Sequence, residues 1–348
     1  MKVAVISDTH YGARKGSQLF HDYFEKFYKE VFFPYLDEHN IKQVIHMGDC
    51  FDSRKGIEFK SLQWAKRVVF DELQSRGIRM HLMVGNHDAY YKNTNNINAV
   101  DLLLNEYDNV VTFSEIEDVM LDGLNVTYIP WINTENHQKT LQHLSNTKSR
   151  VAFGHLELTG FKVNKYVNME CEHTASMFKD FDKVFSGHFH TRSDDGKVFY
   201  LGNPYEMFWT DVLDNRGFTI FDTDTLEHTP INNPFRLFYN IYYEDDDHQL
   251  FDAREYRNKI VKVVVKKKSD VLQFEKFIDK LYSVGVADLK VVENFEFTGW
   301  NTEQSEEIES EDTLSILDRY IKETDTELNK IKLQNLMREI YQEACEVT

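Results

Sequence analysis

The stretch that decides the fold of this chain is Val3-Ala4-Val5-Ile6-Ser7-Asp8-Thr9-His10. Its first four residues are apolar and partly β-branched, a composition typical of a buried strand. An aspartate and a histidine follow where that strand should end. On a continuing strand, Asp8 and His10 would point to the same face, because they are two residues apart, and they could grip one cation. The chain therefore begins with a strand that carries potential metal ligands to its carboxyl end.

The same arrangement recurs along the chain. Apolar runs at 44–47, 80–84, 151–153 and 183–185 are each followed by a short polar stretch: Gly48-Asp49-Cys50-Phe51-Asp52, Gly85-Asn86-His87-Asp88, Gly154-His155 and Gly187-His188-Phe189-His190. Helical periodicity over 19–39 and 59–75 separates the first three runs. Alternating strands and helices predict an α/β fold with a largely parallel sheet. Ligands collect at the carboxyl ends of such strands, so we expect one shared site.

The residue types in these stretches suit two metal ions. Asp49 could bridge both ions through its two oxygens, Asn86 offers a carbonyl oxygen, and His188 and His190 could reach different ions. Nitrogen and oxygen ligands without thiolates favour Mn, Fe or Zn over a structural zinc site. Taken singly, Asp49 could be a helix N-cap and Gly85-Asn86 a turn. Their joint occurrence at strand ends favours a two-metal site, which typically attacks phosphate esters.

Composition sets wider limits. The chain has 348 residues, is 41% hydrophobic, and carries 40 basic against 58 acidic residues, for a net charge of −18. This balance argues against a simple basic DNA-binding surface, but two bound cations would still attract phosphate. The three cysteines, Cys50, Cys171 and Cys345, show no paired spacing and indicate a reducing compartment. Without a signal-peptide pattern or a long apolar run, we expect a cytoplasmic protein with no membrane partner.

Composition also suggests four regions. Residues 1–230 carry the polar stretches, and Asn232-Asn233-Pro234 marks a boundary to a small α/β accessory domain at 231–300. Residues 301–312 are densely acidic and are predicted to form a linker. Residues 313–348 hold two amphipathic segments, which could dock on the core or on a partner's coiled coil. Lys266-Lys267-Lys268 is interpreted first as a solvated strand end, with a DNA phosphate contact as the alternative.

The order of these motifs resembles the calcineurin-like metallophosphoesterase superfamily. Within it the chain is most similar to the SbcD-like nucleases of double-strand-break repair, and among those to the recombination endonuclease subunits of T-even-type phages. Further residues that carry this likeness are Ile129-Pro130-Trp131, Glu157-Leu158-Thr159-Gly160-Phe161 and Arg216-Gly217-Phe218. The resemblance implies a four-layer αββα sandwich with a small α/β capping domain and a C-terminal helical pair. It is strong to about residue 228 and looser beyond.

The resemblance also implies a role for each site residue. One ion would be held by Asp8, His10 and His190, the other by Asn86, His155 and His188, and Asp49 would bridge them. His87 would be the catalytic histidine that stabilises the transition state or protonates the leaving 3′-oxygen. Asp52 departs from the pattern, because some relatives carry a second catalytic histidine there. We interpret it as a catalytic-centre residue that orients a neighbouring ligand.

The implied function is a metal-dependent DNA nuclease, using two divalent ions, Mn²⁺ first and Mg²⁺ as the alternative. Its implied partners are DNA, as double-strand ends or single strands, an SMC-like coiled-coil ATPase that binds the C-terminal helices, and a second copy in a homodimer. The dimer contact could involve the helix at 19–39, whose aromatic residues could equally be ordinary core. If the chain is phage-encoded, its location would be the host bacterial cytoplasm. The alternatives are a phosphoesterase for small esters or phosphoproteins, and a non-catalytic scaffold.

Overall fold

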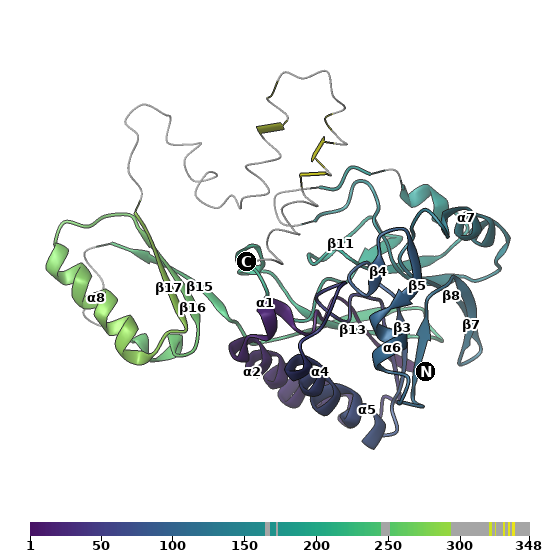
Figure 1. Ribbon diagram of the computed structural model, residues 1–348, viewed down its shortest axis with the longest axis horizontal. Helices are drawn as coiled ribbons and strands as arrows, with labels where there is room; N and C mark the ends of the chain where they lie inside the picture. Colours follow the sequence, from purple (N-terminus) through teal and green to yellow (C-terminus); the bar gives the residue numbers. More distant parts are fainter. Residues whose placement is uncertain are drawn as a thin grey trace. The chain divides into compact units, whose positions relative to one another are not determined.

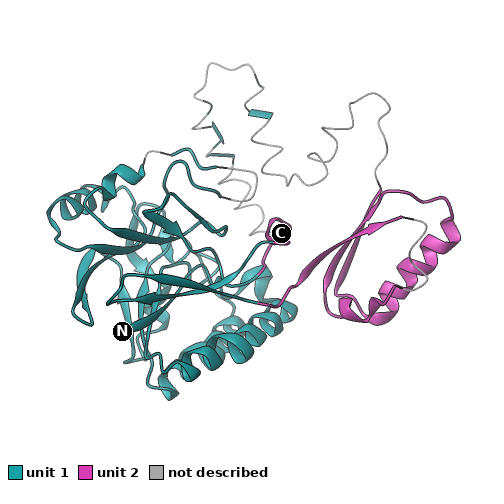
Figure 2. Ribbon diagram, turned by 180° about the vertical axis from the view of Figure 1, so that it is seen from behind, with its two compact units in different colours: residues 1–205, 214–233, 317–348 teal, residues 206–213, 234–316 magenta. Residues whose placement is uncertain are grey.

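The computed structural model describes residues 1–163, 168–171, 173–244 and 251–293, with 320–321, 324, 330, 333–334 and 336–337 beyond them. The described residues divide into two compact units (Figure 2). The first contains 1–205 and 214–233 with the described residues after 317, and the second contains 206–213 and the described part of 234–316. The predicted linker at 301–312 and most of the predicted helical region at 313–348 lie outside the described residues.

The first unit contains two mixed sheets of six strands each (Figure 1). The first sheet has the order β14-β13-β1-β2-β3-β6. Its strands are β1 (Lys2–Ile6), β2 (Gln43–His46), β3 (Arg79–Met83), β6 (Val110–Phe113), β13 (Gly217–Asp222) and β14 (His228–Asn232). The run β1-β2-β3-β6 is parallel, with Ala4 opposite Val44 and Val44 opposite Met80, whereas β13 and β14 add antiparallel edges. The carboxyl ends of β1, β2 and β3 therefore lie at one edge.

The second sheet repeats this plan in the order β11-β12-β10-β9-β8-β7. Its strands are β7 (Glu117–Leu121), β8 (Leu124–Ile129), β9 (Val151–His155), β10 (Lys183–Gly187), β11 (Ser193–Asp194) and β12 (Val198–Tyr200). The strands β8, β9, β10 and β12 are parallel, and a hairpin adds β7 antiparallel to β8. The predicted parallel strands are thus present, but they are divided between two sheets.

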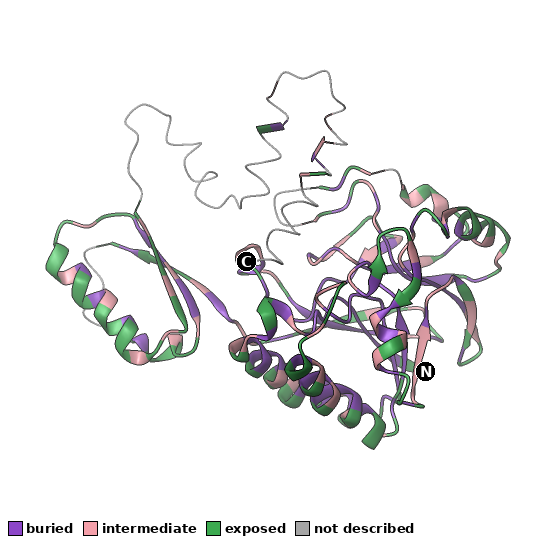
Figure 3. Ribbon diagram, viewed as in Figure 1, coloured by how far each residue is buried: buried purple, intermediate pink, exposed green. Residues whose placement is uncertain are grey.

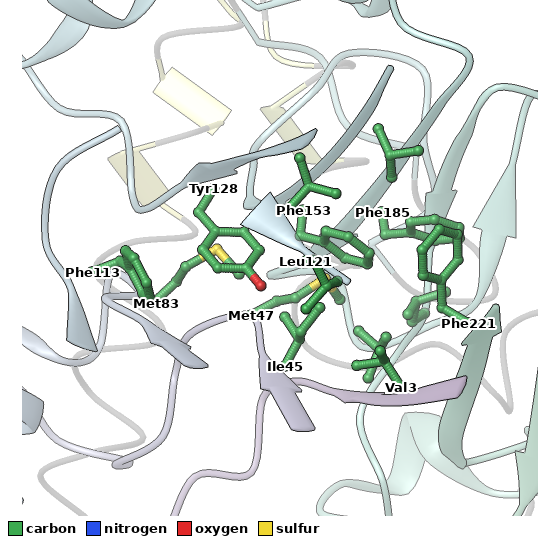
Figure 4. Close-up of a cluster of buried hydrophobic side chains, with 14 residues drawn as sticks. Val3, Ile45, Met47, Met83, Phe113, Leu121, Tyr128, Phe153, Phe185 and Phe221 are labelled. Atoms are coloured by element: carbon green, nitrogen blue, oxygen red, sulfur yellow. The ribbon is translucent and has the colours of Figure 1, made fainter. Parts of the chain in front are cut away.

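A shared core joins the two sheets face to face (Figure 4). Val3 and Ile45 of the first sheet pack in one buried cluster with Tyr128, Phe153 and Phe185 of the second. None of these five side chains is more than 1% exposed, so the cluster removes a large apolar area from water and stabilises the sandwich. This arrangement confirms the predicted α/β sandwich class.

Helices cover the outer faces. The helix predicted at 19–39 is α2 (Gln18–Phe27), a π-helical turn (Tyr28–Phe32) and α3 (Phe33–Glu38), and the one predicted at 59–75 is α4 (Phe59–Ala65), a π-helical turn (Lys66–Phe70) and α5 (Asp71–Ser75). Over the second sheet, α7 (His137–Asn146) contributes Leu144 to a separate cluster with Ile129, Ala152 and Val184. The shorter elements are α1 (Ala13–Gly16), α6 (Ala99–Leu103), β4 (Ala89–Tyr91), β5 (Thr94–Asn98) and a 3-10 turn at Ala175–Phe178.

The aromatic residues of α2 belong to the core, the plainer of the two interpretations of this helix. Phe24 and Phe27 are fully buried, and Phe24 stacks on Tyr205 with ring centroids 3.7 Å apart. The hydroxyl of Tyr205 donates a hydrogen bond of 2.6 Å to the carbonyl oxygen of Thr9, between Asp8 and His10. The helix therefore supports the loop that carries two predicted ligands.

The second unit is a small α/β layer. Its strands β15 (Phe238–Tyr243), β16 (Ile260–Val265) and β17 (Asp288–Glu293) are parallel, and α8 (Val271–Val284) packs on one face through Phe274, Phe277 and Leu281. Two 3-10 turns, Trp209–Asp211 and Ala253–Tyr256, complete it. The buried carboxylate of Glu206 accepts bonds of 2.7 and 3.0 Å from the amides of Leu237 and Phe238, which anchors the start of β15.

The lysine cluster at 266–268 lies just beyond the end of β16, where the plainer interpretation expects it. The ammonium of Lys268 pairs with Glu293 at 2.6 Å, and that of Lys266 lies 5.0 Å from the ring centroid of Tyr242. A DNA contact by these lysines stays a prediction. Among the described residues, no helix meets the length and apolar character that crossing a membrane requires.

Replacing Phe24 by alanine should destabilise the first unit by about 3–5 kcal/mol, because it removes a fully buried ring and leaves a cavity beside Tyr205. Urea unfolding followed by circular dichroism measures the change. The control is Phe59→Ala, at a ring that is 88% exposed, which should change stability by less than about 0.5 kcal/mol. Equal stability of the two variants would contradict the proposed packing.

Candidate metal centre

The predicted ligands converge at one edge of the sandwich. They follow or end five strands of both sheets: Asp8 and His10 after β1, Asp49 after β2, Asn86 after β3, His155 at the end of β9, and His188 and His190 after β10. Several hydrogen bonds cross between the sheets here. The amide of His188 donates to Asp8 Oδ1 at 2.9 Å, and Nδ1 of His155 lies 2.8 Å from the carbonyl oxygen of Met47. The site thus depends on how the two sheets pack together.

Asp8, His10 and His190 form the first group that could hold a metal ion. Each offers one ligand atom, and these atoms all lie within 4.8 Å of one another. The Nε2 atoms of His10 and His190 face each other at 3.2 Å. Two imidazole nitrogens and a carboxylate oxygen around one point are a typical divalent-metal donor set.

Asp49, His155 and His188 form the second group, which meets the same distance limit. The amide oxygen of Asn86 belongs with it, because it lies 2.9 Å from Nε2 of His155 and 3.0 Å from Nδ1 of His188. Oδ2 of Asp49 is 3.3 Å from Nε2 of His155 and 3.8 Å from Nε2 of His10. Asp49 therefore lies within reach of both groups.

The backbone of the ligand loops is left-handed at four of the ligands. Asp8, His10, Asp49 and His188 have φ angles of 54°, 44°, 52° and 79°. The expectation that Asp8 and His10 share a face of a continuing strand is wrong, because β1 ends at Ile6. Left-handed residues other than glycine cost about 1–2 kcal/mol each. Such strain is typical of functional sites, where the surrounding structure holds it in place.

Glycines allow the loops to approach closely. Gly48 has φ of 100° and forms a bend directly before Asp49. A Cβ atom on Gly85 would lie 2.2 Å from both the backbone nitrogen and Oδ1 of Asp49. Any side chain at position 85 would therefore displace the aspartate that stands between the two groups.

Asp88 connects two of these loops and was not singled out from the sequence. Its buried carboxylate accepts hydrogen bonds from the amides of Gly85, Cys50 and Phe51 at 2.9, 3.0 and 3.0 Å. Burial, together with the nearby charge of Asp49, raises the pKa of Asp88 to about 6. An aspartate as the fourth residue of Gly85-Asn86-His87-Asp88 was the available signal, but only the fold reveals that it bonds to a different loop.

Hydrogen bonds orient the histidines. The 2.8 Å contact of His155 Nδ1 with a carbonyl oxygen requires a proton on Nδ1, which leaves Nε2 able to bind a cation. Nδ1 of His10 faces Oδ1 of Asp52 at 3.4 Å, and Nδ1 of His87 lies 2.7 Å from the carbonyl oxygen of Asp52. Asp52 therefore contacts His10, a candidate ligand, and His87, the site histidine that is expected to bind no metal.

The electrostatics of the centre favour cations. Burial alone would lower the pKa of His10, but the carboxylates of Asp52 and Asp49 outweigh it and raise the pKa to about 9. The pKa of His155 also rises to about 9, because Asp49 outweighs the effect of burial. Burial holds the pKa of the Cys50 thiol well above its usual range, so it stays protonated and is no metal ligand. Buried carboxylates, imidazoles and an amide oxygen therefore fit two divalent ions.

Three further side chains surround the ligands. Oε1 of Glu157 lies 3.7 Å from Nε2 of His188, and the guanidinium of Arg216 donates to the carbonyl oxygen of His190. The indole of Trp131 contacts His188 with ring centroids 5.1 Å apart. All three occur in stretches quoted for the family likeness, but no role was expected for them.

Comparisons with known proteins agree with this centre. Residues 1–192 match the family model of the calcineurin-like phosphoesterases. "Exonuclease subunit 1" of Enterobacteria phage T4 is 31% identical over 323 residues, which cover 92% of this chain and 92% of that protein.

Two solved structures are more distant. A novel archaeal phosphodiesterase is 16% identical and covers 67% of this chain and 100% of its own, with a TM-score of 0.35. The purple acid phosphatase PPD1 from yellow lupin (Lupinus luteus) seeds is 12% identical and covers 55% of this chain and 38% of its own, also with a TM-score of 0.35. At these TM-scores neither structure bears on the function of this chain.

Replacing Gly85 by alanine should weaken Mn²⁺ binding by about 10- to 100-fold, because the new methyl group would push Asp49 out of place. Isothermal titration calorimetry on metal-free protein measures the affinity. Gly56→Ala is the matched control, since a Cβ there meets nothing within 4 Å. Unchanged Mn²⁺ affinity in a folded Gly85→Ala protein would show that this close approach does not support the site.

Proposed function

We propose that this chain, which belongs to the calcineurin-like phosphoesterase family, is a two-metal deoxyribonuclease that acts at DNA ends. Family membership makes it a hydrolase of phosphoester bonds. The observation that carries the proposal is the pair of adjacent donor groups with Asp49 within reach of both. A phosphodiester can span such a pair, and the phage relative is named an exonuclease subunit.

In this proposal Asp8, His10 and His190 hold one divalent ion, Asn86, His155 and His188 hold the other, and Asp49 bridges them. Mn²⁺ is the expected metal, with Mg²⁺ as the alternative, as the family resemblance implies. Mixed nitrogen and oxygen donors suit a transition metal such as Mn²⁺ better than Mg²⁺, which prefers oxygen ligands. Bound ions would supply Lewis-acid stabilisation of the phosphate and lower the pKa of an attacking water. The protein itself holds the donors in place through strained loops and hydrogen-bonded imidazoles.

His87 is the proposed catalytic histidine. Its Nδ1 is occupied by the carbonyl oxygen of Asp52 at 2.7 Å, and its amide donates to Oδ1 of Asp49 at 2.8 Å. These contacts fix the ring in an edge-on packing against His10, with centroids 4.9 Å apart. Nε2 is then the atom that would meet the leaving 3′-oxygen. Because Nδ1 already donates to a carbonyl oxygen, Nε2 has a proton to donate to that oxygen only when the ring is protonated on both nitrogens. Asp52 acts as a positioning residue for both histidines.

The substrate and partners follow from the rest of the chain. The second unit is proposed to contact DNA. The phage relative is called a subunit, which supports a partner protein. We infer that this partner is an SMC-like ATPase bound by residues 313–348, and that the chain forms homodimers. A chain with a net charge of −18 would gain much of its DNA-binding surface from such a partner.

Replacing His87 by alanine should leave Mn²⁺ affinity close to that of the natural chain but lower DNA cleavage by about 10²- to 10⁴-fold, because only a proton-transfer group is lost. Asp49→Ala should lose both ions and all cleavage. Calorimetry and a gel assay on end-labelled DNA measure the two effects. His39→Ala, at an exposed histidine directly after α3, is the control and should be fully active. Loss of metal by the His87 variant would make His87 a ligand instead.

The nuclease assignment is tested by Mn²⁺-dependent digestion of end-labelled DNA beside hydrolysis of nitrophenyl phosphate esters and a phosphopeptide. DNA should be the preferred substrate, and chelation should stop its cleavage. Full activity in a folded, metal-free preparation would refute the mechanism. Rapid hydrolysis of the esters or the phosphopeptide without cleavage of DNA would favour a phosphatase.

Removal of the residues from Leu314 onward should leave the nuclease active, because the proposed ligands lie between 8 and 190. It should abolish association with the ATPase partner, measured by co-elution in size-exclusion chromatography. The full chain is the control. Continued co-elution of the shortened chain would move the partner contact into the preceding residues.

A further inference from the structure

The hairpin of β4 and β5 directly follows His87 and Asp88, and it is firmly attached to the metal centre. The amide of Ala89 donates to the carbonyl oxygen of Gly85 at 3.3 Å, and the amide of Ala99 donates to that of Asp88 at 2.8 Å. At its far strand, the buried side chain of Asn95 donates to the carbonyl oxygens of Ser114 and Trp131 at 3.1 and 2.9 Å. The hairpin is therefore a rigid extension of the loop that carries the catalytic histidine.

The pairing of this hairpin is irregular beside the tyrosines, with the extra residues on β5. Ala89 pairs with Asn98 and Tyr91 pairs with Thr94, and the register shifts between the two pairs. Consecutive side chains of a regular strand point to opposite faces and do not pack on each other. Here Tyr90 and Tyr91 contact each other edge to face, with ring centroids 4.8 Å apart and an interplanar angle of 82°.

Both tyrosines face solvent. Tyr90 is 43% exposed and Tyr91 is 50% exposed, and the exposed Lys92 follows them. Figure 3 shows exposed segments in green, including parts of the β4–β5 hairpin. A single exposed aromatic residue is ordinary on a protein surface. Here two exposed tyrosines are in contact on a hairpin beside the candidate metal centre. They add nothing to the sandwich core and present aromatic faces to whatever binds there. Bulges are over-represented next to active sites.

We propose that Tyr90 and Tyr91 form a stacking platform for an unpaired nucleobase of the strand being cleaved. This inference rests on the proposed nuclease function and deepens it. Tyr91 is four residues from His87, so the platform lies within about 14 Å of the catalytic histidine along the chain, a span of only a few nucleotides. Every base has an aromatic face, so stacking holds a strand without reading its sequence. It requires a base that is not paired.

The platform therefore selects DNA ends whose terminal bases are unpaired. A duplex end must open before its base can stack, whereas a single-stranded end binds directly. The exposed Lys92 lies beside the platform, where it adds positive charge in an otherwise acidic chain. The occupant is a nucleobase of the substrate, because the platform continues from the loop of His87.

The test compares variants of the full chain on a single-stranded oligonucleotide and on bis-nitrophenyl phosphate, which carries no base. In the double variant Tyr90→Ala/Tyr91→Ala the KM for the oligonucleotide should rise about tenfold or more, with bis-nitrophenyl phosphate hydrolysis unchanged. Tyr90→Phe/Tyr91→Phe should retain the natural KM. Ile97→Ala is the matched control, on the same hairpin and 47% exposed but not aromatic.

A second arm alters the substrate. Abasic sites are placed one at a time from the cleaved end of the oligonucleotide. An abasic site at one of these positions should raise the KM of the natural chain about tenfold. The same abasic site should have no further effect in the double alanine variant, because the two changes remove the same contact.

Three results would overturn the platform. The double alanine variant could keep the natural KM for the oligonucleotide, or it could lose as much activity on bis-nitrophenyl phosphate as on the oligonucleotide. Its activity could also return at high protein concentration while light scattering reports a broken dimer. The last would assign the tyrosines to a contact between copies. If the proposed nuclease function is itself wrong, a different result is expected: the natural chain would hydrolyse bis-nitrophenyl phosphate but not DNA.

Discussion

Much of this structure depends on one buried carboxylate, that of Asp49. It lies 3.3 Å from a nitrogen of His155 and 3.8 Å from one of His10, and it is only 2% exposed. An ionised carboxylate in such a place is unfavourable unless cations or hydrogen bonds compensate it. The amide of His87 supplies one such bond, and the imidazoles around it supply positive charge when protonated. Two divalent ions would supply it more strongly.

The apolar core of the sandwich offsets the cost of bringing these charged side chains together. Left-handed backbone at four ligands and buried polar groups at one edge both oppose folding, and the apolar cluster between the sheets offsets them. Several hydrogen bonds at the site cross from one sheet to the other, and Asp88 ties the loop after β2 to the loop after β3. The rigid core and the strained centre are therefore coupled: the loops keep their shape because the sheets beneath them do not move.

A metal-dependent nuclease need not be a basic protein. With a net charge of −18, this chain can attract phosphate only locally, at the cations it would bind and through a partner. An aromatic platform would complement such a centre, because stacking is largely independent of charge. It would also explain why two tyrosines close to His87 in the chain are exposed rather than buried.

The sequence alone determined the order and type of most elements, because apolar runs and helical periodicity are local patterns. The helices at 19–39 and 59–75 and the strands that precede the polar stretches all lie where those patterns predict, to within a residue or two. It also named the donor residues, since aspartate, asparagine and histidine directly after strands have few other uses together. The resemblance, rather than the local pattern, led to the sandwich of two sheets.

Only the tertiary structure decided how those residues meet. The end of β1 before Asp8, the bond of Asp88 to a loop 38 residues away, and the edge-to-face contact of Tyr90 with Tyr91 all depend on packing across the chain. The sign of a backbone angle and the partner of a buried carboxylate have no local signal. They are set by the sheets that close around them, because a strained or charged group persists only where the surrounding structure leaves it no alternative.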